Sequence, residues 1–315
     1  SLNAIVQVVE ESLGQAEAMD NAHPGDAAPP LWGVPVTTKI NVDQTGYANS
    51  NGVPALAGNI CAADSPVVAN LRSAGANIIG RTNTPEFSMR WFTSNPLHGT
   101  TLNPWDHSLT PGDSRGAAAA AVACGIGCIG HGNDLGGSLR YPAYCCGVAT
   151  IRPSLGRVPA ANLSARAERP PLSQAMSVQG PIARDLSDVR LALEAMSRRS
   201  SLDPNWVNAR DSGRTRTRPI RIGYCLDPFP GLTTDAHAQA GMRAALAACL
   251  EVGLAARELA FPEAERAAEL WGELLFAETE IAMGDVVRQC ASPEFLSLTE
   301  GYLAHYRKRD FAGYL

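Results

Sequence analysis

The sequence contains almost no lysine: only Lys39 and Lys308, against 24 arginines in 315 residues. Arginine stays charged in proteins, whereas a buried lysine can lose its proton and serve as a base. Lys308 lies in the charged run Tyr-Arg-Lys-Arg-Asp, but Lys39 ends the apolar run Val-Pro-Val-Thr-Thr, which is typical of a strand entering the interior. We therefore expect Lys39 to be buried. The alternative is a genome that disfavours lysine codons and a Lys39 that only reaches out to solvent.

Other features are also missing. No basic run is longer than three residues and the net charge is −5, which argues against a nucleic-acid groove. No signal peptide and no uncharged apolar stretch of membrane-spanning length is recognised, so we expect a cytoplasmic protein with no membrane partner. The sequence begins within a strand-like run and stops without a closing element. We therefore expect the native chain to extend beyond both ends.

The eight cysteines include no Cys-x-x-Cys pair. Cys124 and Cys128 have a ligand-like spacing, but their surroundings are rich in alanine and glycine, and the adjacent pair Cys145 and Cys146 is poorly placed to chelate one zinc. We expect buried, reduced thiols, with no metal and no cofactor. His131 is expected to be a packed or hydrogen-bonded histidine rather than a catalytic one.

The segment 110–142 carries the strongest chemical signal. Ser114 and Ser138 each lie in a glycine-containing turn, and a helix-forming alanine run separates them. Glycine allows a turn to reach positive φ and lets several main-chain N–H groups crowd around one atom. The run Gly136-Gly-Ser138 can thus place a hydroxyl and N–H donors at one point, as acyl transfer requires.

Two charged residues flank this turn. We expect Asp134 and Arg140 to pair and to hold the N–H groups of the turn in place. The alternative is two separate surface charges.

The apolar patterns predict alternating strands and helices. Strands are predicted at 4–9, 34–40, 77–81, 127–131 and 220–225, and helices at 10–22, 66–74, 117–123, 186–196, 236–251 and 263–288. This mix predicts an α/β fold in which helices cover both faces of a sheet. A polar, arginine-rich stretch at 197–219 is the best candidate boundary. We expect a core at 1–200 and a helical, substrate-side lobe at 201–315.

Segments at five separated places, in this order and spacing, resemble the amidase signature family. They are residues 33–43 around Lys39, 64–87, 103–142 with both serines, 146–159 and 179–188. The similarity covers residues 30–190 with gaps. It implies a large mixed β-sheet covered by helices on both faces, and an amidase that cleaves a small-molecule amide to an acid and ammonia or an amine.

The resemblance also implies roles for individual residues. Lys39 matches the base, Ser114 the bridging serine after a cis peptide bond, and Ser138 the nucleophile of an acyl-enzyme mechanism. The implied oxyanion hole consists of the backbone N–H groups of Leu135, Gly136, Gly137 and Ser138. In this relay, neutral Lys39 takes a proton from Ser114, which takes one from Ser138 as Ser138 attacks the amide carbonyl.

The sequence departs from the family beside the bridging serine. The family has Gly-Gly-Ser-Ser-Gly-Gly where this chain has Gly112-Asp113-Ser114-Arg115-Gly116-Ala117. A hydrogen-bonded pair of Asp113 and Arg115 would offset part of this change. A catalytically impaired member or silent scaffold is therefore one alternative. Another is the amidase (A-type) subunit of a glutamine-dependent tRNA amidotransferase.

The sequence gives a weaker indication of which acyl group the substrate carries. The aromatic patch 89–92 and the loop 162–172, with Arg166, Glu168 and Arg169, are candidates to shape a pocket for an aryl or other apolar acyl group. The alternative is that Trp91 and Phe92 fill the core. Whether the protein forms a homodimer is left open.

Overall fold

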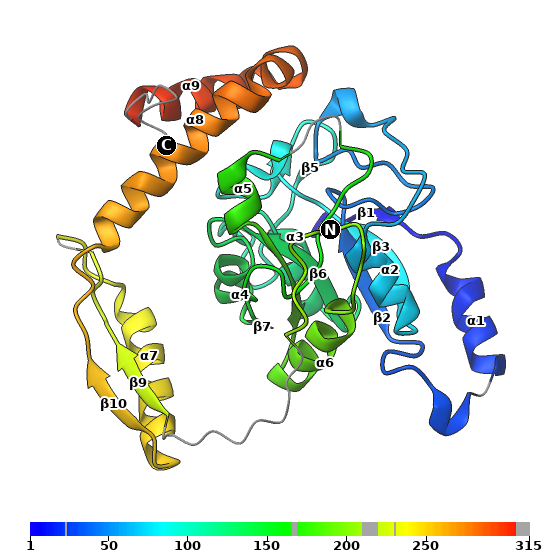
Figure 1. Ribbon diagram of the computed structural model, residues 1–315, viewed down its shortest axis with the longest axis horizontal. Helices are drawn as coiled ribbons and strands as arrows, with labels where there is room; N and C mark the ends of the chain where they lie inside the picture. The colour runs from blue at the N-terminus through cyan, green and yellow to red at the C-terminus, as the bar shows by residue number, and fades with distance from the viewer. Residues whose placement is uncertain (23, 166–168, 210–219, 230, 307–315) are drawn as a thin grey trace. The chain divides into compact units, whose positions relative to one another are not determined.

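The computed structural model describes residues 1–22, 24–165, 169–209, 220–229 and 231–306 (Figure 1). Its contacts divide the chain into two compact units, Ser1–Arg210 with Ala282–Leu298, and Asp211–Ile281 with Thr299–Leu315. A single boundary between residues 200 and 201 was expected, whereas residues 282–298 group with the N-terminal unit. Arg166, Glu168 and Lys308 lie outside the described residues.

A mixed sheet forms the centre of the first unit (Figure 1). It has six strands in the order β1, β3, β2, β6, β8, β7. β2 runs parallel to both β3 and β6, while β1, β8 and β7 are antiparallel to their neighbours. The strands are β1 Ile5–Val8, β2 Pro35–Lys39, β3 Asn77–Thr82, β6 Ile129–Asp134, β7 Ala149–Thr150 and β8 Val178–Ala183. The predicted mixed sheet is confirmed.

Helices cover both faces of this sheet. Side chains of α2 (Pro66–Ser73) and α6 (Leu186–Met196) share one apolar cluster with Ile129 of β6. On the other face lie α3 (Gly116–Ala123) and α4 (Arg140–Cys146), whose apolar cluster includes Ile182 of β8. Neighbouring strand residues point to opposite faces, and Gly130 next to Ile129 accordingly faces Ala118 of α3. The run of small residues in α3 lets this helix lie close to the sheet.

The remaining elements surround the sheet or form the second unit. In the first unit they are α1 Ser12–Ala22, α5 Pro171–Met176, the short hairpin β4 Ser94–Asn95 and β5 Gly99–Thr100, and the 3₁₀ turns η1 Gly25–Ala27, η2 Pro54–Leu56 and η3 Glu86–Ser88. The second unit holds β9 Arg221–Tyr224, α7 Ala236–Glu251 and β10 Ala255–Glu258, with β9 parallel to β10. The helices α8 Ala264–Cys290 and α9 Pro293–His305 each contribute residues to both units.

Two expectations from the sequence need correction. β8 was not predicted as a strand, although it pairs with both β6 and β7. All eight cysteines are free, as expected, but only Cys61 and Cys146 are buried and Cys124 is exposed. In the part of the chain that the structure describes, no helix combines the length and the apolar character needed to cross a membrane.

Candidate functional site

Lys39 is the last residue of β2 and its side chain is completely buried. Its Nζ lies 2.6 Å from the Oγ of Ser114 and 3.1 Å from the Oγ of Ser88. Burial lowers the pKa of Lys39 well below its usual value, the nearby Arg115 lowers it further, and Asp113 opposes both effects. The alternative of a lysine that reaches solvent is therefore wrong.

The loop before α3 presents Ser114 to this lysine. The peptide bond between Asp113 and Ser114 is cis, as the family resemblance implied. Gly112 has a φ of 84°, and a Cβ at this position would lie 2.7 Å from the Cα of Pro142 in α4. Glycine is therefore required both by the backbone conformation and by the close approach of the loop to α4. This packing brings the two serine segments together.

Ser138 lies on the turn between β6 and α4 and is half-buried. In the described part of the chain no hydrogen bond joins Ser138 to Ser114. The structure therefore brings Lys39 and Ser114 into direct contact, and it places the Ser138 segment beside them through the packing of the Ser114 loop on α4.

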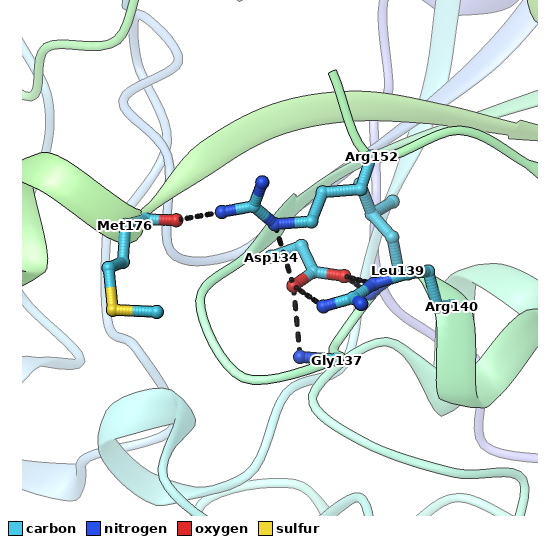
Figure 2. A network of polar contacts seen from close by, with 6 residues as sticks. All are labelled: Asp134, Gly137, Leu139, Arg140, Arg152 and Met176. Atoms are coloured by element: carbon cyan, nitrogen blue, oxygen red, sulfur yellow. Dashed lines mark hydrogen bonds and ion pairs between the residues drawn. The ribbon is translucent and has the colours of Figure 1, made fainter. Parts of the chain in front are cut away.

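Asp134, at the end of β6, organises the Ser138 turn (Figure 2). Its buried carboxylate accepts the N–H of Gly137 at 2.9 Å and that of Leu139 at 3.1 Å. Arg140 donates to both carboxylate oxygens at 3.1 Å, which confirms the predicted pair. Arg152, which was not predicted, lies 3.5 Å from the same carboxylate and donates to the carbonyl of Met176 at the end of α5.

This network restricts which N–H groups of the turn are free. The N–H of Gly137 is already committed to Asp134. The structure gives no acceptor among its described residues to the N–H groups of Leu135, Gly136 and Ser138. Of the four predicted oxyanion donors, Gly137 thus acts in this structure as an anchor of the turn.

The hydrogen-bonded pair of Asp113 and Arg115 that would offset the departure from the family pattern is not formed. Both side chains are buried, and within the described residues neither the Asp113 carboxylate oxygens nor the Arg115 guanidinium nitrogens have a hydrogen-bond partner. Burial raises the pKa of Asp113 well above its usual range and lowers the pKa of Arg115 well below its own. The guanidinium instead lies against Gly132 of β6, where any Cβ would collide with it.

His131 and the aromatic patch have clear environments. His131 is buried, and its Nε2 lies 2.8 Å from the Oε1 of Gln179, so the prediction of a hydrogen-bonded histidine is confirmed. Burial lowers the pKa of His131 to about 3. Trp91 and Phe92 are 48% and 45% exposed and therefore do not fill the core. Trp91 makes an edge contact with Tyr141, at 6.1 Å between ring centroids.

Two residues that the sequence did not single out hold the end of β2. Ser88, in η3, contacts Lys39 directly, but 49 residues separate the two in sequence. Arg81 of β3 is buried and donates to the carbonyls of Val42 and Ala48, which fixes the turn after Lys39. No pattern in the local sequence of either residue indicates this contact.

The described part of the loop 162–172 lies near the same turn. Asn162 donates to the carbonyl of Asn41 at 2.9 Å, and the N–H and hydroxyl of Ser164 both donate to Asp43. Among the residues that the structure describes, no group of three His, Cys, Asp or Glu side chains is arranged to hold a metal ion.

Comparisons with known proteins place the chain in a family. A protein-family model described as Amidase matches residues 1–314. Indoleacetamide hydrolase of Bradyrhizobium diazoefficiens is 45% identical over 316 residues, which cover 100% of this chain and 60% of that protein. The A-type subunit of the glutamyl-tRNA(Gln) amidotransferase of Deinococcus radiodurans is 34% identical over 270 residues, or 84% of this chain and 54% of that protein.

A solved structure supports the same assignment at the level of the fold. A bacterial aryl acylamidase of the amidase signature enzymes family superposes with a TM-score of 0.79 at 23% identity, covering 96% of this chain and 65% of that one. The chain thus belongs to the amidase signature family. It spans 60% and 54% of the lengths of the two curated relatives.

Proposed function

We propose that this protein is an amidase that hydrolyses a carboxylic amide through Lys39, Ser114 and Ser138. The observation that carries the proposal is the 2.6 Å contact between the buried Nζ of Lys39 and the Oγ of Ser114. Burial lowers the pKa of Lys39 and so favours the neutral amine, which is the form that can accept a proton. A buried amine against a serine hydroxyl is the arrangement that a proton relay needs.

In the proposed mechanism the substrate carbonyl lies at the Ser138 turn. As the Oγ of Ser138 attacks the carbonyl carbon, its proton passes to Ser114, and the proton of Ser114 passes to Lys39. Collapse of the tetrahedral intermediate breaks the C–N bond, and the relay returns a proton to the leaving nitrogen. Water then repeats the same steps on the acyl-enzyme and releases the acid.

The turn supplies the electrostatic part of catalysis. The N–H groups of Leu135, Gly136 and Ser138 are the proposed donors to the developing oxyanion, and Asp134 keeps the turn in shape by holding Gly137. One such donor typically contributes about 3–4 kcal/mol to the transition state. Asp134 and Arg140 are thus proposed as supporting residues.

We propose an aryl or other apolar acyl group as the preferred substrate class. Trp91 and Phe92 expose nearly half of their surface, and Tyr141, which Trp91 contacts, lies three residues beyond Ser138. The name of the relative from Bradyrhizobium diazoefficiens, an indoleacetamide hydrolase, agrees with such a group. A cytoplasmic location and the absence of a nucleic-acid partner stay predictions.

A second candidate is the A-type subunit of a tRNA-dependent amidotransferase, because one such protein is 34% identical to this chain. A glutaminase assay with and without partner subunits separates the two candidates. An amidase hydrolyses aryl amides by itself, whereas an amidotransferase subunit releases ammonia from glutamine efficiently only within its complex.

Turnover of a panel of aliphatic, aryl and cyclic amides tests the main proposal. Hydrolysis is expected with at least one aryl amide, and Ser138→Ala is expected to abolish it without changing the circular dichroism spectrum. A Ser138→Ala protein that keeps more than about a tenth of the wild-type rate would remove Ser138 from the role of nucleophile, since covalent catalysis depends on it.

A further inference from the structure

We propose that Ser88 is a positioning residue for Lys39, whose hydroxyl oxygen accepts an N–H of Lys39 and turns the lone pair of the neutral amine toward Ser114. The inference rests on the proposed function, because it concerns how the base of that reaction is oriented. Nothing in the sequence motifs assigns a role to Ser88.

The neighbours of the Ser88 hydroxyl decide which way its hydrogen points. Ser88 donates to the Oδ1 of Asn51 at 2.7 Å, and this amide oxygen can only accept. The Nδ2 of Asn41, which can only donate, lies 3.0 Å from the same hydroxyl oxygen. The Oγ1 of Thr84 also lies 3.0 Å from the Ser88 oxygen, and it acts as a donor when the Ser88 hydrogen goes to Asn51. With its hydrogen committed to Asn51, the Ser88 oxygen faces Lys39 as an acceptor at 3.1 Å.

This polarity fixes the orientation of the lysine. A neutral amine has two N–H groups and one lone pair, and rotation about its last C–N bond costs little when no partner holds it. Directing one N–H to Ser88 leaves the lone pair available for the hydroxyl of Ser114, 2.6 Å away. A hydrogen-bond acceptor at Ser88 thus holds one N–H of Lys39 away from Ser114, so that the lone pair can accept the hydrogen of the Ser114 hydroxyl.

The backbone around Ser88 is held in an unusual conformation. Phe87 and Ser88 have φ values of 53° and 61°, in the left-handed region that residues other than glycine seldom occupy. The flanking Glu86 is buried and accepts both the N–H and the hydroxyl of Ser292, and the ring of Phe87 lies 5.1 Å from that of Phe295. The fold therefore maintains a conformation that carries the Ser88 hydroxyl to Lys39.

The test compares Ser88→Ala and Ser88→Gly with wild type by two readouts. Amide turnover gives kcat and KM, and the rate at which a fluorophosphonate labels Ser138 reports the activation of that serine without an amide substrate. Both variants are expected to lose about 10- to 100-fold in kcat and in labelling rate, as misplaced catalytic groups do, with KM within about twofold. Because glycine adopts positive φ freely, equal losses assign the effect to the hydroxyl.

The pH profile supplies a readout that a purely structural role would not move. The Ser88 oxygen stabilises the ammonium form of Lys39 more than the amine, so its removal lowers the pKa of Lys39 further. Asp113 and Arg115, the charged groups facing Lys39, are unchanged in these variants. In the plot of log kcat against pH, the acid limb of Ser88→Ala is therefore expected at lower pH than that of wild type. The maximal kcat of Ser88→Ala is lower than that of wild type.

Two further variants complete the design. Asn51→Gly, which removes the acceptor of the Ser88 hydrogen, should add no loss when combined with Ser88→Ala, because both act through one hydroxyl. Ser94→Ala, which removes a hydroxyl that bonds to Thr100, should label at the wild-type rate. Wild-type labelling in Ser88→Ala, or a loss confined to Ser88→Ala and absent from Ser88→Gly, overturns the inference. If the wild-type protein hydrolyses no amide, the proposed function is wrong. The rates at which the fluorophosphonate labels wild type and the Ser88 variants still test whether Ser88 positions Lys39.

Discussion

At the scale of single residues, the environment of Lys39 depends on two buried charges. Burial disfavours the ammonium form and lowers the pKa of Lys39, and the cation of Arg115 lowers it further, whereas Asp113 raises it. Arg115 stands where the family has a second serine, and Gly132 leaves the space that its guanidinium occupies. The departure from the family pattern therefore favours a neutral lysine.

Replacing Arg115 by Met tests this electrostatic role while keeping most of the side-chain volume. Loss of the cation raises the pKa of Lys39, and the proposed mechanism requires the neutral amine, so the acid limb of the pH–rate profile should move to higher pH. The profile of kcat/KM measures the shift. Arg190→Met, which removes an exposed cation paired with Glu194, is the matched control and should leave the limb in place. A limb that moves to lower pH in a folded Arg115→Met protein would contradict the account.

Side-chain contacts between residues close in sequence could be predicted from the sequence, and contacts between distant residues could not. Asp134 and Arg140 are six residues apart on one turn, so their pairing follows from the local chain path. The contact of Ser88 with Lys39 depends on η3 folding back across 49 residues, and no residue pattern encodes it. The missing Asp113–Arg115 bond also has a non-local cause, because the guanidinium lies against Gly132 on another element.

At the scale of elements, the connection from β6 to α4 holds the proposed nucleophile Ser138. β6 ends at Asp134, and beyond it the chain is held by the Asp134 carboxylate rather than by strand pairing. The carboxylate accepts hydrogen bonds from two backbone N–H groups and from Arg140, and it forms an ion pair with Arg152. Burial alone raises the pKa of Asp134, but the hydrogen bonds from Arg140, Gly137 and Leu139 outweigh it, so the pKa is lowered. The turn is thus held by a group that is ionised at neutral pH.

Asp134→Asn should loosen this turn. The loss of charge-assisted hydrogen bonds is expected to lower the free energy of unfolding by about 1.5–3 kcal/mol and to reduce kcat more than it raises KM. Because the folded pKa of Asp134 is lowered, its contribution is present above the ordinary carboxyl pKa of about 3.9 and disappears as pH falls through the folded value. Urea unfolding of wild type and Asp134→Asn from pH 7 to pH 3 measures how the difference in free energy of unfolding depends on pH. A gap in stability that stays constant over that range would contradict it.

The fold at this scale was predicted where strands carry β-branched residues and missed at a strand that contains glycine and proline. β2 and β3 are rich in valine, isoleucine and threonine, and the sequence indicates both. β8 contains Gly180 and Pro181, residues that argue against a central strand. It is nevertheless paired on both edges, with Pro181 opposite His131, and its Gly180 faces Leu139, where a larger residue would collide. Tertiary packing overrides local propensity here.

At the scale of the whole chain, residues close to the C-terminal end complete the first unit. Ser292 binds Glu86 through its N–H at 2.7 Å and its hydroxyl at 2.6 Å, and Arg90 pairs with Glu294 at 2.7 Å. These contacts explain why residues 282–298 group with the sheet rather than with the C-terminal lobe. They also hold η3, which carries Ser88.

Ser292→Ala tests whether the contact between Ser292 and Glu86 holds η3 in place. Removing the hydroxyl leaves the buried Glu86 short of one donor, which is expected to lower the free energy of unfolding by about 1–3 kcal/mol and to reduce kcat through η3. Ser297→Ala, at an exposed position of α9, the helix that follows Ser292, is the control. Urea unfolding and turnover assays measure the two effects. Equal stability of the two variants would show that the contact with Glu86 does not hold the segment.

The most direct measurement of the central claim is mass-spectrometric mapping of the residue that a fluorophosphonate modifies, in wild type and in Lys39→Arg. Lys39→Arg keeps a cation but removes the titratable base. The proposed relay predicts one adduct, on the peptide containing Ser138, absent from Ser138→Ala and formed far more slowly in Lys39→Arg. An adduct on another residue, or labelling of Ser138 at the wild-type rate in Lys39→Arg, would contradict it.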